Sequence, residues 1–158
     1  MQVTTDALDA KGNFDPRYTS DFDNSSPELR WDGIPDEAQC FALIAEDPDA
    51  RGGVFTHWVI YNIPAQIRHL PAGIPAQEML PNGIRQGINS FGKLGYSGPY
   101  PPSGDGTHRY YFRVYALSQR PEVPSRATRE QLIGAISPHV IAIGELMGHY
   151  QRLIQKAG

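Results

Sequence analysis

The chain has 158 residues, of which 40% are hydrophobic and 20% charged, and its formal net charge is −3 with neutral histidines. This length and balance are typical of one globular domain, residues 1–158, and they argue against nucleic acid as a partner, because nucleic-acid-binding proteins usually carry a basic surface. The start of the chain lacks the basic and apolar segments of a signal peptide, and no stretch reaches the roughly 20 apolar residues of a membrane span. We therefore expect a cytoplasmic protein without an integral membrane segment.

Two apolar runs near the middle of the chain predict a β-hairpin. Residues 39–47 (QCFALIAED) have the length of a buried strand, and residues 54–63 are rich in β-branched and aromatic residues. The segment EDPDARGG between the two runs carries Asp, Pro and Gly, which suit a tight turn. The only cysteine, Cys40, lies in the first run, so it has no disulfide partner within the chain, and we expect a buried, inert thiol.

The second run carries a histidine in an apolar setting. Strict alternation places His57 on one face with Phe55, Val59 and Tyr61, while the opposite face is also apolar. A strand with two apolar faces is covered on both sides. We therefore expect a central strand in which His57 is buried or lines a cavity.

A third strand is predicted over residues 108–117, HRYYFRVYAL. Alternation directs His108 and Tyr110 to the same face as the apolar side chains that follow them, whereas the arginines at 109 and 113 mark the wetter face. Before this strand, residues 89–107 include five glycines and three prolines and show no strand or helix pattern. Structureless segments of this length inside a compact domain are usually functional, and glycine–proline loops can expose backbone amides to an anion.

The C-terminal part of the chain predicts two helices. Thr128 and Gln131 form a capping box that opens a helix through Ile136. Ser137 and Pro138 then suit the start of a second helix. Its apolar residues recur at spacings of three and four and predict a stripe that packs on a sheet: Ile143, Leu146, Met147, Tyr150 and Ile154.

Three kinds of chemistry suit the polar side chains of the predicted strands. A metal site is disfavoured, because no close ligand motif such as H-x-x-x-H occurs and DPDARGG is not an EF-hand loop. Acyl transfer by Ser97 is disfavoured, because a nucleophile elbow needs glycine where this chain has Pro99. An anion pocket accounts for all of these polar groups. In it, His57, His108 and Tyr110 donate hydrogen bonds beside the glycine-rich loop, and an aspartate orients a histidine.

Four ordered motifs resemble the phosphatidylethanolamine-binding protein family, specifically its compact bacterial and archaeal branch of Raf-kinase-inhibitor-like proteins. They are SPELRWDGIP (26–35), FALIAEDPDA (41–50), HWVIYNIP (57–64) and GPYPPSGDGTHRYYFRVYAL (98–117). The resemblance spans residues 26–152. It implies a mainly β fold, an antiparallel β-sandwich with short peripheral and C-terminal helices.

The same resemblance implies a pocket for phosphate or phosphoryl head groups at a sheet edge. We expect no cofactor and no metal. Carried over position by position, the implied ligand-binding residues are Asp47, Asp49, His57, Gly98, Pro99, His108 and Tyr110. Members of the family are implicated in binding phospholipid head groups, in modulating kinases and in inhibiting serine-type peptidases, and compact members are often homodimers. Two positions depart from the pattern, because Arg51 and Tyr100 stand where proline and cysteine are frequent.

We therefore expect a non-catalytic binding protein whose partner is a small phosphorylated or anionic ligand. The alternative is a protein-interaction module that inhibits a peptidase or a kinase through the pocket rim and loops. If both histidines donate to the anion, binding should strengthen as they gain protons below their reference pKa of about 6.5.

Overall fold

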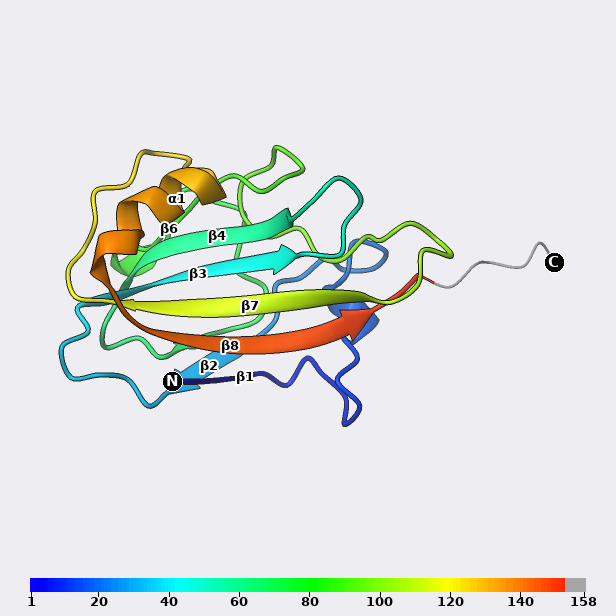
Figure 1. The fold of residues 1–158 in the computed structure, drawn as a ribbon, viewed down its shortest axis with the longest axis horizontal. Helices are drawn as coiled ribbons and strands as arrows, with labels where there is room; N and C mark the ends of the chain where they lie inside the picture. Colours follow the sequence, from blue (N-terminus) through cyan, green and yellow to red (C-terminus); the bar gives the residue numbers. More distant parts are fainter. Residues whose placement is uncertain (153–158) are drawn as a thin grey trace.

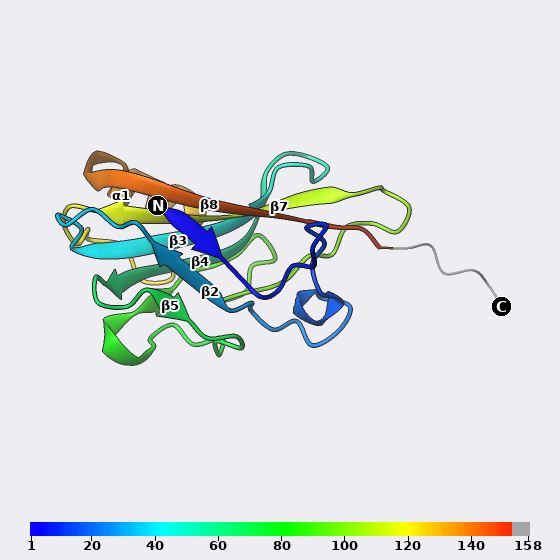
Figure 2. The same ribbon diagram turned by 90° about the horizontal axis from the view of Figure 1, so that it is seen from below.

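The computed structural model describes residues 1–152, and within them eight strands form two antiparallel sheets (Figures 1 and 2). The larger sheet has the order β6-β4-β3-β7-β8, and the smaller has the order β1-β2-β5. The predicted mainly β, antiparallel fold is confirmed. The strands are β1 (Gln2–Thr4), β2 (Leu29–Asp32), β3 (Cys40–Asp47), β4 (Phe55–Pro64), β5 (His69–Leu70), β6 (Arg85–Gln86), β7 (His108–Leu117) and β8 (Val140–Tyr150).

The larger sheet is covered on both faces. On one face, the smaller sheet contributes Leu29, Trp31 and Leu70 to the main core, which also holds Trp58 and Phe112. On the other face, a second cluster forms where Leu132 and Ile136 pack over the sheet. These two residues belong to α1 (Arg129–Ile136), and three single turns of 3-10 helix complete the described elements: η1 (Pro16–Tyr18), η2 (Pro81–Gly83) and η3 (Ser137–His139).

The three strands predicted in the middle of the chain are confirmed. β3 and β4 pair antiparallel as the expected hairpin, and β3 also pairs with β7, so β3 lies at the centre of the larger sheet and is buried throughout. The Cys40 thiol is buried, and burial raises its pKa, as expected for an inert thiol. No helix within residues 1–152 has the length and the apolar character that crossing a bilayer requires.

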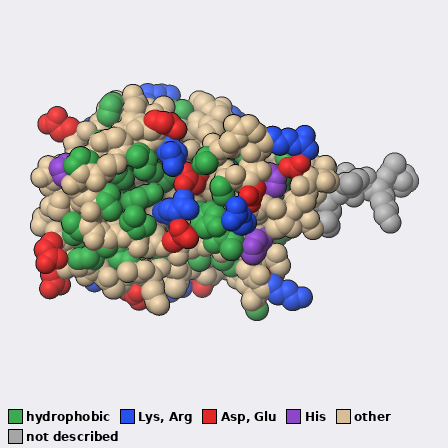
Figure 3. All heavy atoms as spheres, viewed as in Figure 1, with side chains coloured by type: hydrophobic (Ala, Val, Ile, Leu, Met, Phe, Trp, Pro, Cys, Tyr) green, Lys and Arg blue, Asp and Glu red, His purple; other side chains and the backbone are tan. Residues whose placement is uncertain are grey.

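On the α1 side of the larger sheet, the part that α1 does not cover is mixed in character. Arg113 of β7 pairs with Glu46 and with Glu145, which confirms that the arginines of this strand lie on the wetter face. Ile141 and Ile143 of β8 are also exposed there. Figure 3 shows hydrophobic side chains gathered beside alternating acidic and basic ones in the same view as Figure 1. The homodimer that the resemblance implies stays a prediction.

The end of the chain is predicted only in part. The helix over 129–136 and its capping box, Thr128 with Gln131, are confirmed. The second predicted helix is wrong, because Ser137–His139 forms a single 3-10 turn and the chain then enters β8. β8 pairs with β7 along its whole length, from Val140 opposite Leu117 to Tyr150 opposite His108.

The expected apolar stripe is consequently divided between the two faces of β8. Leu146 and Tyr150 pack against the main core, whereas Ile143 is exposed on the opposite face. Ile154 lies outside the described residues. The glycines of β8 leave room for neighbours, since a Cβ atom at Gly148 would lie 2.6 Å from Leu8 Cδ2. The apolar residues therefore have the sequence spacing of a helix, although the segment forms a strand.

Alanine at Gly148 tests the strand assignment. A methyl group at this position would overlap Leu8 and the Phe14 ring, so Gly148→Ala should lower the free energy of unfolding by about 1–3 kcal/mol. In a helix the same change would raise it by roughly 0.5–1 kcal/mol. Gly134 of α1 faces open space, so Gly134→Ala is the matched control and should stabilise the protein by that smaller amount. Urea unfolding measures both, and a gain at Gly148 would contradict the strand.

Candidate functional site

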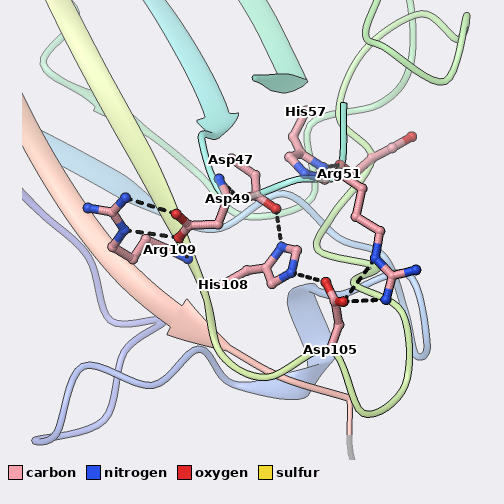
Figure 4. A network of polar contacts seen from close by, with 8 residues as sticks. Asp47, Asp49, Arg51, His57, Asp105, His108 and Arg109 are labelled. Carbon is pink, nitrogen blue, oxygen red and sulfur yellow. Dashed lines mark hydrogen bonds and ion pairs between the residues drawn. The ribbon is translucent and has the colours of Figure 1, made fainter. Parts of the chain in front are cut away.

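Three segments that are distant in sequence meet at one end of the larger sheet (Figure 4). Asp47 is the last residue of β3, and His108 is the first residue of β7. Because β3 and β7 are antiparallel neighbours, the end of the first strand lies beside the start of the second. The start of β4 adds His57 to the same end.

His57 reaches the site through a β-bulge. Ala45 of β3 pairs with Trp58, and Glu46 pairs with Thr56, so the register shifts across His57. Strict alternation predicts that His57 faces the α1 side together with Val59 and Tyr61, and this prediction is wrong. The bulge turns the imidazole to the opposite face, where its ring centre lies 5.4 Å from that of Tyr110.

The His57 imidazole is buried and neutral at pH 7. Its Nδ1 atom lies 2.6 Å from the backbone oxygen of Ser97, and the Ser97 N–H donates back to the His57 carbonyl at 3.0 Å. Because a carbonyl can only accept, the proton of the neutral ring is on Nδ1 and Nε2 carries a lone pair. Burial lowers the pKa of His57 to about 4 and outweighs its hydrogen bond to Ser97.

The His108 imidazole is held between two carboxylates. Its Nδ1 atom lies 2.6 Å from Asp47 Oδ2, and its Nε2 atom lies 2.6 Å from Asp105 Oδ2. Burial by itself would lower the pKa of His108, but the hydrogen bonds to the two carboxylates outweigh burial and the net direction is upward. We therefore assign an imidazolium that donates from both nitrogens. The pKa values of the two histidines shift in opposite directions from the reference value of about 6.5, and the expected strengthening of binding below that pH stays a prediction.

Asp105 extends the network to the protein surface. Its Oδ1 atom accepts from Arg51 Nε at 3.0 Å and also from Arg51 Nη2. Hydrogen bonds from Arg51, and then from His108, lower the pKa of the Asp105 carboxyl. The Arg51 guanidinium, the Asp105 carboxylate, the His108 imidazolium and the Asp47 carboxylate thus follow one another in a line with no net charge.

Tyr110 presents a polar group without a partner. The residue is only 2% exposed, and no described residue forms a hydrogen bond with its hydroxyl in suitable geometry. Burial first, and the nearby Asp47 carboxylate second, raise the pKa of the phenol. The group is therefore a neutral hydroxyl that can donate to an acceptor brought in from outside.

These side chains surround one pocket with a volume of about 190 Å³. Its polar groups come from the three strands and from the turn after β3, and the remainder of the lining is apolar or aromatic. The space suits a small ligand that carries one strongly polar group. The lining residues are Asp47, Ala50, Arg51, Phe55, His57, Phe91, Tyr100, Pro101, Pro102, His108 and Tyr110.

Three of the predicted site residues support the pocket without lining it. Asp49 forms a two-pronged ion pair with Arg109, which lowers the pKa of the aspartate to about 2. The Gly98 N–H already donates to Asn24 Oδ1 at 2.6 Å, and the Pro99 carbonyl accepts from the Ser20 N–H. These two residues therefore anchor the loop, and the Gly98 amide is not free for an anion.

Gly98 also has a steric requirement. A Cβ atom at this position would lie 2.1 Å from the backbone oxygen of Tyr18, so only glycine allows the loop to approach η1 this closely. Of the predicted set, Asp47, His57, His108 and Tyr110 come together around the cavity.

Sequence reasoning missed Asp105 and the aromatic wall formed by Phe55 and Phe91. Asp105 carries one usable signal, because it stands between two glycines in the loop and three residues before His108. For Phe91 no pattern is available, since it lies in an irregular segment. Within residues 1–152, no group of three or more His, Cys, Asp or Glu side chains is arranged to hold a metal ion.

The lowered pKa of His57 predicts a pH-dependent contribution to stability. The unfolded chain takes up a proton near pH 6.5, whereas folded His57 does so only near pH 4, so its contribution is complete above 6.5 and is lost as the pH falls toward 4. Relative to His57→Gln, the wild type should lose about 2–3 kcal/mol of unfolding free energy between pH 7.5 and 4.5. Urea unfolding of both proteins at both pH values measures this, and parallel pH profiles would contradict the assignment.

Comparison with known proteins places the chain in a family. The family model described as phosphatidylethanolamine-binding protein matches residues 4–151. A UPF0098 protein of Methanothermobacter thermautotrophicus is 45% identical over 152 residues, which are 96% of this chain and 99% of that protein. Another UPF0098 protein, from Pyrococcus abyssi, is 44% identical and covers 86% of this chain and 77% of its own length.

Two solved structures share the fold over nearly the whole chain. Escherichia coli YbcL, described as a new member of the mammalian PEBP family, superposes with a TM-score of 0.87 at 32% identity and covers 98% of both chains. A Chlamydia trachomatis PEBP homologue superposes with a TM-score of 0.84 at 35% identity and covers 96% of this chain and 97% of its own. The chain therefore belongs to the phosphatidylethanolamine-binding protein family.

Proposed function

We propose that the protein binds, without chemical turnover, a small ligand that carries a phosphoryl group, in the pocket between His57, His108 and Tyr110. The observation that carries this proposal is the unpartnered hydroxyl of Tyr110, buried next to the cavity. A buried donor without an acceptor costs about 1–3 kcal/mol. A phosphoryl oxygen in the pocket would supply the missing acceptor.

The charges around the pocket favour a ligand with both an anionic and a cationic end. Arg51 and His108 supply positive charge for a phosphoryl group. The Asp47 carboxylate, together with the rings of Phe55 and Phe91, suits an ammonium group. Phosphorylethanolamine, free or as a lipid head group, has both ends.

The contacts of Ser97 support binding over acyl transfer. His57 Nδ1 contacts the Ser97 backbone oxygen, whereas the Ser97 hydroxyl oxygen accepts from Asn89 Nδ2 at 3.2 Å. A serine nucleophile needs its hydroxyl within reach of a general base, and here the imidazole contacts the backbone instead. Membership of the family supports a binding protein as well.

A protein partner, such as a kinase or a serine-type peptidase, is the second candidate. The pocket rim favours it because Phe91 and Tyr100 are 41% and 49% exposed beside the cavity. Large exposed aromatic side chains are common in protein interfaces. A protein that acts only through this rim would not bind the free small ligand, so the titration described next separates the two candidates.

Calorimetric titration with phosphorylethanolamine at pH 7.5, with inorganic phosphate as a second probe, tests the pocket. We expect binding by the wild type and roughly tenfold weaker binding by Tyr110→Phe, because one hydrogen bond to a charged acceptor is lost. The variant should unfold at the same or a higher urea concentration, since it no longer buries an unpaired hydroxyl.

Tyr96→Phe is the matched control for this substitution. The Tyr96 hydroxyl is buried but donates to the Tyr18 carbonyl at 2.7 Å, and the residue does not line the pocket. Loss of the Tyr96 hydroxyl should lower the free energy of unfolding by about 1 kcal/mol and leave the affinity for phosphorylethanolamine unchanged. Equal affinity of Tyr110→Phe and the wild type would contradict the role of Tyr110, and failure of the wild type to bind either probe would contradict the proposed function.

A further inference from the structure

The side chain of Asp105 occupies the position of a bound anion. Its two oxygens accept from the imidazolium of His108 on one side and from the guanidinium of Arg51 on the other (Figure 4). An arginine fork together with a second cationic donor is a common way to hold a phosphoryl group or a carboxylate. The carboxylate of Asp105 therefore stands in for the oxygens of an anionic ligand.

The tip of the loop, around Asp105, is held mainly by this carboxylate. Gly104 and Gly106 flank the residue with φ angles of 78° and 85°, which only glycine adopts without strain. A Cβ atom at Gly106 would meet nothing within 4 Å, so its surroundings do not confine it. Close to Asp105 the loop also has a local hydrogen bond from Asp105 N to the Pro102 carbonyl and two long ones, each 3.4 Å, from Gly104 N to the Arg152 carbonyl and from Thr107 Oγ1 to Gln151 Oε1.

The two cationic groups that Asp105 binds also line the pocket. Arg51 and His108 line the cavity, while Asp105 approaches them from the loop and does not line it. The Arg51 side chain is 73% exposed, so it can turn without disturbing the core. A ligand in the pocket and the Asp105 carboxylate therefore compete for the same donors.

We propose that Arg51 and His108 Nε2 form an anion subsite and that Asp105 is its internal occupant, which the phosphoryl group of the ligand displaces. This inference rests on the proposed function and adds Arg51 to the residues that contact the ligand. Every anion must first displace Asp105 from these donors. The internal occupant therefore lowers the affinity for every anion by the same factor, so that only anions that contact the donors strongly enough bind. If Asp105 stayed in place, its charge would instead repel a dianion more than a monoanion.

Asp105→Asn tests the displacement with two ligands of different charge. At pH 6.5 phosphorylethanolamine is largely a phosphate dianion, because its second pKa is about 6, whereas the phosphate of glycerophosphorylethanolamine, a diester, carries a single charge. Calorimetry should show about tenfold tighter binding of both ligands by the variant, by the same factor. Arg51→Gln added to Asp105→Asn should remove most of this gain.

A control separates the local effect from the change in net charge. Asp36 is exposed and lies before the start of β3, at the end of that strand opposite to Asp47. Asp36→Asn makes the same change in charge and should leave both affinities unchanged. Asp105→Ala, which leaves no side-chain group to contact His108, should bind both ligands more tightly, as Asp105→Asn does.

Backbone amide NMR of the wild type gives an independent readout. Added phosphorylethanolamine should shift the signals of Gly104 and Gly106 as strongly as those of residues next to the pocket. Three results would overturn the displacement and leave the proposed function intact. They are wild-type binding with no gain of affinity in Asp105→Asn, a gain of affinity that is larger for the dianion, and glycine signals that do not shift. Failure of the wild type to bind either ester would overturn the proposed function and, with it, the internal occupant that rests on it.

Discussion

The imidazolium of His108, buried between the carboxylates of Asp47 and Asp105, is the contact on which the site depends. A charge in the interior is costly unless partners of opposite charge contact it directly, and here each ring nitrogen has one at 2.6 Å. Since Asp47 ends β3 and Asp105 lies in the loop before β7, this pairing fixes the end of one strand and the approach to the next. The cavity takes its shape from that arrangement.

The sheet supplies the rigidity that the pairing requires. Asp47 pairs with Phe55 of β4 and His108 pairs with Tyr150 of β8, so neither residue can shift without disturbing a strand ladder. The bulge in β4 then turns His57 to the face of Tyr110. Burial makes His57 neutral, while two carboxylates keep His108 charged. The same residue type thus offers a lone pair at one wall of the pocket and a positive charge at another.

Local patterns in the sequence predicted the central elements correctly, because apolar runs ended by turn residues and a capping box are local signals. β8 could not be predicted in this way, since its pairing with β7 and the room that Gly148 leaves for Leu8 are long-range contacts. Similarly, the alternation along β7 correctly predicted that His108 and Tyr110 point inward, and both line the site. The face of His57 depended on a register shift, and the role of Asp105 on how an irregular loop folds back, and neither is visible in residue spacing.

The protonation states of the two histidines test this account most directly. Imidazole nitrogen shifts, recorded by long-range ¹H–¹⁵N NMR between pH 5 and 8, distinguish charged rings and the two neutral forms. We expect His108 to keep protons on both nitrogens as the pH rises past 6.5, while His57 stays neutral with its proton on Nδ1 down to about pH 5. A His108 that loses its proton below pH 6.5, or a charged His57 at pH 6, would contradict these assignments.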